Sequence, residues 1–61
     1  MAVYEEMERR LRRELRFLAE AKVWLERSGA AYENPDALVG IEREMGRIRR
    51  MLEELEKERG G

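Results

Sequence analysis

Two residue types that often support small folds and catalytic sites are missing from this 61-residue chain. Cysteine is absent, which excludes disulfide bonds and thiolate metal sites. Histidine is absent as well, and with it the commonest transition-metal ligand and the commonest general base. A chain this short buries only about 60% of its unfolded surface, so its fold is marginal as a monomer. We therefore expect oligomerisation to supply the missing stability.

Long apolar runs and aromatic residues are also scarce. No apolar run reaches transmembrane length and no signal-peptide pattern opens the chain, so we expect a cytoplasmic protein without membrane contact. Charged residues make up 44% of the chain, yet the net charge is only −1, which argues against a strong overall attraction to nucleic acid. Few aromatics with high charge can indicate disorder, but the apolar residues here are periodic and favour an ordered fold.

The residues needed for catalysis are few. Ser28 is the only serine, and no histidine is present to activate its hydroxyl group. The chain has no glycine-rich phosphate loop and no nucleotide-binding motif. We expect a protein that is not an enzyme and that uses no cofactor and no metal.

The single proline marks the only strong break in the chain. In Asn34-Pro35-Asp36, Asn34 suits a helix N-cap, Pro35 the first helical position, and Asp36 the positive end of the helix dipole. Gly29 suits the left-handed position after a preceding helix. The expected organisation is one domain over 1–61, with a helix at about 2–28, a loop at about 29–34, a helix at about 35–59 and a flexible tail at 60–61.

Apolar residues recur every three or four positions on both sides of this break, which places each set on one stripe of a helix. The second set comprises Leu38, Ile41, Met45, Ile48, Leu52 and Leu55. The first set comprises Tyr4, Met7, Leu11, Glu14, Leu18, Ala21 and Leu25. Because the connection is short, the two helices should pack as an antiparallel, all-α helical hairpin.

The apolar surface is wider than one helix–helix contact can cover. A lone hairpin would leave Leu15, Phe17, Trp24 and Met51 largely in water, and burying one such side chain is worth about 1.5–3 kcal/mol. Stripes of this width are typical of bundle helices, so we expect two hairpins to form a four-helix bundle, with a dimer favoured. The expected oligomer interface comprises Leu11, Glu14, Leu15, Phe17, Leu18, Trp24, Met45, Ile48, Met51 and Leu52.

Glu14 interrupts the first stripe near its middle. A charged residue in a helix–helix contact sets register and partner choice at a cost in stability, and Arg10 or Arg49 could neutralise it. Carboxylate metal sites in bundles gather several inward Glu residues with Glu-x-x-His motifs, which this chain lacks. The structural interpretation is therefore preferred.

Arginines form outward stripes on both predicted helices, in the same half of the hairpin. Some have acidic neighbours four residues away, whereas Arg9–Arg13 and Arg12–Arg16 are like-charge pairs at that spacing. A positive patch for phosphates or an acidic protein is therefore expected, although no base-reading side chains accompany it. Its members are Arg9, Arg12, Arg13, Arg16, Arg43, Arg47 and Arg50.

Two glycines and two aromatics complete the unusual features. Gly40 and Gly46 each cost about 1 kcal/mol inside a helix, which is either a tolerated cost or a sign that another backbone approaches there. Trp24 and Tyr32 flank the turn, and we expect them to pack over that end of the hairpin. The alternative is that they are exposed anchors for another protein.

These features predict a small protein-interaction module, an adaptor, regulator or inhibitor, that acts as a homo-oligomeric bundle on a protein partner. One alternative is a nucleic-acid-binding bundle that uses the arginine-rich face. The other is a structural assembly segment of a larger complex.

Overall fold

A computed structural model describes residues 2–60 of the chain. Three helices account for nearly all of this range: α1 (Ala2–Ser28), α2 (Ala30–Glu33) and α3 (Pro35–Glu58). No strand occurs between residues 2 and 60, so the predicted all-α class is confirmed. The segment predicted as a loop contains the single-turn helix α2, and of the predicted flexible tail Gly61 lies outside the described residues.

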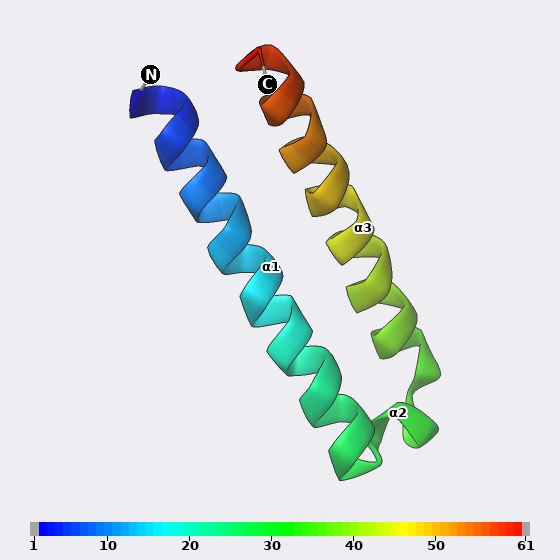
Figure 1. Ribbon diagram of the computed structural model, residues 1–61. Coiled ribbons are helices and arrows are strands. Elements are labelled where there is room, and N and C mark those ends of the chain that lie inside the picture. The colour runs from blue at the N-terminus through cyan, green and yellow to red at the C-terminus, as the bar shows by residue number, and fades with distance from the viewer. Residues whose placement is uncertain (1, 61) are drawn as a thin grey trace.

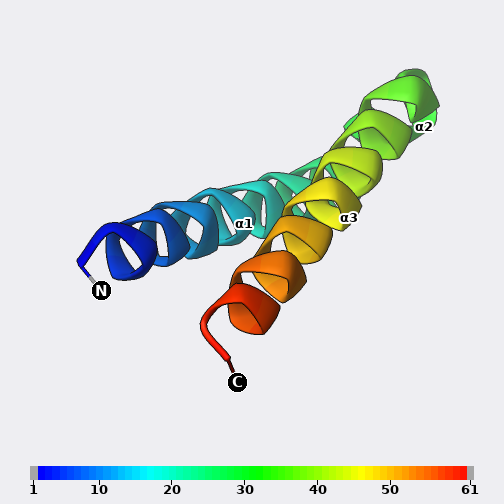
Figure 2. The same ribbon diagram turned by 90° about the horizontal axis from the view of Figure 1, so that it is seen from above.

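The two long helices lie side by side, with α2 at one end and both chain ends at the other (Figure 1). Seen from above, α1 and α3 draw apart from α2 toward the chain ends (Figure 2). The molecule measures 44 × 15 × 13 Å, so it is a rod one helix pair thick. Every helix in it therefore has a large surface in contact with solvent.

The turn between the long helices is built by backbone geometry. Gly29 adopts the left-handed conformation (φ +82°) that its position after α1 predicts. Asn34 occupies the N-cap of α3 and Pro35 its first turn, as predicted, but the Asn34 side chain makes no capping hydrogen bond. Instead, the Asn34 amide donates to the carbonyl of Ala30 (2.9 Å), and the Asn34 carbonyl accepts from Ala37 (3.1 Å).

The core is a narrow band between α1 and α3. Ile48 is its centre, with 1% of its surface exposed, and it clusters with the buried Leu11 and Leu55. The stripe predicted on α3 is confirmed, since Met45 is also buried and the rest of the set is at least half-buried. The side chains packed around the central cluster are Tyr4, Leu15, Leu18 and Leu52.

On α1, the residues that face α3 differ in part from those predicted. Glu14 and Met7 are exposed, so neither lies between the helices, whereas Leu15 is half-buried against the core. We call the side chains of α1 that face α3 the seam. They are buried or half-buried, and their spacing alternates between four and three residues. They are Tyr4, Glu8, Leu11, Leu15, Leu18, Lys22 and Leu25.

The physical reason is that two heptads overlap on α1 and share Tyr4, Leu11, Leu18 and Leu25. One heptad would bring the Glu14 carboxylate against α3, while the other brings the aliphatic side chain of Leu15, and desolvating a carboxylate is far more costly. The charged residues of the chosen heptad, Glu8 and Lys22, are long enough to reach water from a half-buried position.

Candidate interaction surface

A third heptad of α1, which shares no residue with the seam, forms a second stripe beside it. Its most exposed apolar side chains are Phe17 (71%), Val3 (67%) and Trp24 (64%). Successive members are again four and three residues apart, so they follow one side of the helix along its length. This outer stripe comprises Val3, Met7, Arg10, Glu14, Phe17, Ala21 and Trp24.

The outer stripe continues onto α3 through a shallow groove. Met7 of the stripe and Met51 of α3 both line this groove, and both side chains are exposed (46% and 40%). The core residues Leu11 and Leu55 also line it, together with Glu54 and Glu58. One broad face of the helix pair is therefore apolar near the chain ends and bordered by carboxylates.

The ten residues predicted at an oligomer interface divide into two groups. Phe17, Trp24 and Met51 are exposed, as expected of a lone helix pair, and Glu14 is exposed among them. The other six pack between α1 and α3, and for Leu15 this corrects the expectation that it would be left in water. These six are Leu11, Leu15, Leu18, Met45, Ile48 and Leu52.

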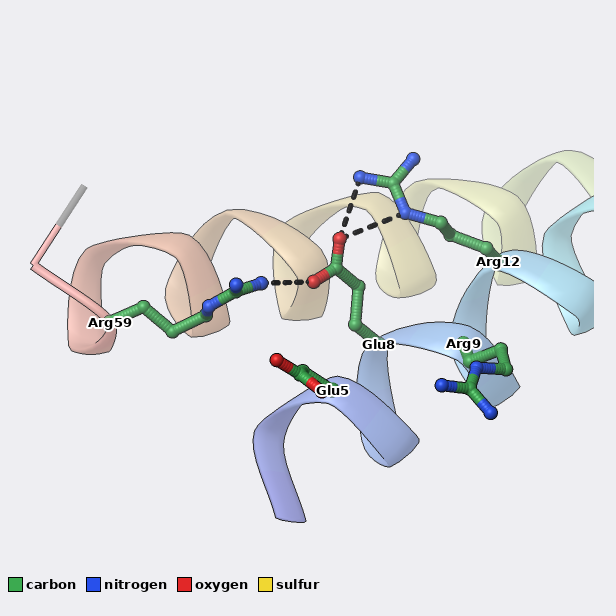
Figure 3. A pocket seen from close by; sticks show the side chains of 5 residues that line it. All are labelled: Glu5, Glu8, Arg9, Arg12 and Arg59. Carbon is green, nitrogen blue, oxygen red and sulfur yellow. Dashed lines mark hydrogen bonds and ion pairs between the residues drawn. The ribbon is translucent and has the colours of Figure 1, made fainter. Parts of the chain in front are cut away.

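Glu8 is the acidic residue of the seam, and the sequence interpretation overlooked it. Its carboxylate accepts hydrogen bonds from Arg12 Nε (3.0 Å), with Arg12 Nη2 at 2.9 Å, and from Arg59 Nη1 (Figure 3). The signal was present in the spacing, because Glu8 precedes Leu15 by seven residues and Arg59 follows Leu52 by seven. Two guanidinium groups bind this carboxylate. We therefore interpret Glu8 as part of an ion-pair cluster that connects the helices, and not as a catalytic base.

The predicted arginine patch is divided by the fold. Arg9, Arg13 and Arg16 are exposed on α1 outside the seam, and shallow depressions lie between them. Arg9 also lines a depression with Glu8 and Arg59 (Figure 3). The α3 group projects from the opposite edge of the helix pair, where Arg47 pairs with Glu44. The seven arginines therefore do not meet on one surface. We call the four on α1 the arginine ridge: Arg9, Arg12, Arg13 and Arg16.

The arginine ridge is incompletely neutralised. Arg12 pairs with Glu8, as its spacing predicts, but Arg9, Arg13 and Arg16 form no ion pair within 4.0 Å over residues 2–60. Positive charge is thus concentrated over two turns of α1. The ridge is separate from the apolar outer stripe, which lies on a neighbouring side of the same helix.

Trp24 and Tyr32 do not cover the turn as expected. Tyr32 is 92% exposed in α2, and Trp24 points into solvent from the last part of the outer stripe. Over residues 2–60, no backbone from outside their own helix lies within 4 Å of a Cβ placed at Gly40 or Gly46, and at Gly46 the nearest atom is the flexible end of Arg50, at 3.9 Å. Both aromatic side chains are available to other molecules.

The described part of the chain offers no grouping of three or more acidic side chains arranged to hold a metal ion. Neither long helix, over residues 2–60, has an apolar stretch sufficient to cross a bilayer. No protein-family model, no curated protein and no solved structure matches this chain. What the structure defines is an all-helical protein with a narrow core and a large exposed apolar stripe.

Proposed function

We propose that this chain is a small, non-enzymatic protein-interaction module that acts as a homo-oligomer, two helical hairpins forming a four-helix bundle. The observation that carries the proposal is the outer stripe, which exposes Phe17 and Trp24 on α1 and continues to Met51 on α3. Several large apolar side chains exposed along one side of a helix favour an interface in a folded protein.

The total surface supports the same conclusion. The chain exposes 5189 Å². A compact monomer of 7.3 kDa exposes about 4,200 Å² by the usual scaling of surface with mass, so the excess here is about 1,000 Å². A stable interface buries about 800 Å² on each partner. The excess is therefore comparable to the area that one dimer contact would remove from water.

A second copy is the occupant that best suits the outer stripe. The stripe extends along a helix of 27 residues, so only a partner element of comparable length covers it. It carries charges of both signs, Arg10 and Glu14, and can therefore complement a copy of itself. With a net charge of −1 the copies repel one another only weakly.

The aromatic side chains near α2 supply the contact to another protein in this proposal. Tyr32 is almost fully exposed, and Trp24 lies nearby at the end of α1. Tyrosine and tryptophan are the residues that most often dominate binding energy at protein interfaces. In a bundle, such aromatics at the turn would be displayed by each copy.

The proposal is tested by comparing Phe17→Gln with Val39→Gln, a matched change at an exposed apolar residue of α3 outside the groove. Light scattering after size-exclusion chromatography should show a dimer for the wild type and for Val39→Gln. Phe17→Gln should shift the population toward monomer at the same concentration. Equal masses for the two variants would contradict a role for the outer stripe, and species larger than a dimer would favour an assembly segment.

A second candidate function rests on the arginine ridge, which presents Arg9, Arg13 and Arg16 without ion pairs in the described chain. Three such side chains match about three phosphates of a nucleic-acid backbone, and no base-reading groups accompany them. Binding would then be independent of sequence. The logarithm of its affinity should fall with the logarithm of salt concentration with a slope of about −2 to −3.

Titration of duplex DNA and duplex RNA at several salt concentrations tests this second candidate. Replacing both Arg9 and Arg13 by Gln should weaken binding and flatten the salt dependence. Replacing Arg43 and Arg50 by Gln, on the opposite edge of the helix pair, should change the affinity much less. Absence of binding at low salt would eliminate the nucleic-acid function.

A further inference from the structure

The order of residues along the outer stripe allows two antiparallel copies of the stripe to match apolar residues with apolar residues and each charge with an opposite charge. Its first six members run apolar, apolar, cation, anion, apolar, apolar. All except Ala21, which is half-buried, are exposed. Read in order along α1, they are Val3, Met7, Arg10, Glu14, Phe17 and Ala21.

From this pattern we propose that the second copy binds with its α1 antiparallel to the first, in the single register that places Arg10 of each copy opposite Glu14 of the other. This deepens, and rests on, the self-association proposed above. This register has a two-fold axis level with Arg12. The same axis places Met7 opposite Phe17 and Val3 opposite Ala21. In a two-fold interface each of these contacts occurs twice.

The charges of the stripe are available for this pairing. Arg10 and Glu14 are both exposed, and neither forms an ion pair within 4.0 Å in the described range of the chain. In the proposed dimer the two reciprocal pairs lie at the centre, between apolar contacts that exclude water. A guanidinium–carboxylate pair in that setting provides direction as well as attraction.

The groove beside Met7 supports the same register. It is lined by Leu11, Met51 and Leu55 in addition to Met7. Because the register places Phe17 of the second copy over Met7, the Phe17 ring meets this groove. The most exposed apolar side chain of the outer stripe is thus covered by apolar surface contributed by both α1 and α3.

A shift of one heptad toward the C-terminus gives the one rival register that also keeps six members of each stripe in contact. It would place Trp24 opposite Met7, but Arg10 opposite Ala21 and Glu14 opposite Phe17. The two Glu14 carboxylates would then approach each other at the centre with no arginine facing them. Leaving buried carboxylates uncompensated costs more than covering one indole ring gains, so the charges select the proposed register.

Reversing the charges one at a time and then mixing the variants tests the register. Arg10→Glu and Glu14→Arg should each raise the dimer Kd at least about 100-fold, because each variant opposes like charges twice. An equimolar mixture of the two should form a heterodimer with a Kd within about tenfold of the wild type, since both central pairs are restored. The readout is sedimentation equilibrium, with circular dichroism confirming that each variant remains helical.

Arg13→Glu and Glu20→Arg are the matched controls, because they make the same changes in charge at exposed positions outside the outer stripe. Both should dimerise like the wild type. If Arg10→Glu and Glu14→Arg also dimerise like the wild type while Phe17→Gln does not, the register is wrong and self-association stands. If the wild type itself is monomeric, both proposals fail.

Disulfide cross-linking distinguishes the two registers independently. Because the chain has no cysteine, only the introduced thiols can react. Copies carrying Met7→Cys and copies carrying Phe17→Cys should form a mixed disulfide efficiently under mild oxidation. Copies carrying Met7→Cys and Trp24→Cys should do so at least about tenfold more slowly, because the reacting thiols are held apart. The reverse order of rates would establish the rival register and overturn the proposed one.

Discussion

Glu8 of α1 and Arg59, the residue that follows α3, are joined by an ion pair although 51 positions separate them in the sequence. They occupy equivalent heptad positions on the two helices, at the end where α1 and α3 draw apart (Figures 1 and 2). Arg12 holds the other oxygen of the Glu8 carboxylate. This cluster connects the helices where apolar contact between them is ending.

Removing the Glu8–Arg59 pair should have a small and salt-dependent effect. The Glu8 side chain is 22% exposed and that of Arg59 is 42% exposed, so water screens the attraction. A double-mutant cycle with Glu8→Gln and Arg59→Gln should give a coupling free energy of about 0.2–1 kcal/mol at low ionic strength. In 1 M NaCl the coupling free energy, measured by chemical denaturation, should fall toward zero. An unchanged coupling free energy would show that the contact is not mainly electrostatic.

The narrow core concentrates stability in one residue. Ile48→Ala should lower the free energy of unfolding by about 2–5 kcal/mol, because it removes the most buried side chain and leaves a cavity. For a chain of this size such a loss is expected to abolish the folded state. Val39→Ala, at a half-exposed position of α3, should change stability by less than about 0.5 kcal/mol. Thermal melts followed by circular dichroism, at one fixed protein concentration, compare the two.

Glycine substitutions at two positions should have opposite effects. Gly40→Ala should stabilise the chain by about 1 kcal/mol, since a Cβ there meets nothing within 4 Å and helical glycine is unfavourable. Gly29→Ala should destabilise it by about 1–2 kcal/mol, because its φ of +82° is strained for an L-residue. Urea titration measures both. A destabilised Gly40→Ala would indicate that another backbone does approach α3 at that point.

Trp24 gives an intrinsic signal for the proposed dimer register. With the two-fold axis level with Arg12, Trp24 lies beyond the overlap of the two α1 helices and stays in water. Its fluorescence emission maximum should therefore remain that of an exposed indole when dilution converts dimer to monomer. A blue shift on association would mean that Trp24 is covered and would favour the register shifted by one heptad.

The sequence predicts the helical class and the two long helices because these depend on local signals: periodic apolar residues, Gly29 and Pro35. The face that α1 turns toward α3 could not be predicted as securely, because Leu11 and Leu18 belong to two heptads at once. Choosing between Glu14 and Leu15 requires the position of α3, which is not a local property. How the arginines of the predicted patch are distributed depends on the pairing of the helices in the same way, since outward faces of paired helices point away from each other.

The mass of the wild-type chain in solution decides whether the outer stripe is an interface between copies. Sedimentation equilibrium over a range of micromolar concentrations should yield twice the chain mass of 7.3 kDa, with dissociation only at the lowest concentrations. If the chain self-associates, the doubled mass should be accompanied by full helicity. A helical species of 7.3 kDa throughout this range would contradict it and would leave Phe17 exposed for a different partner.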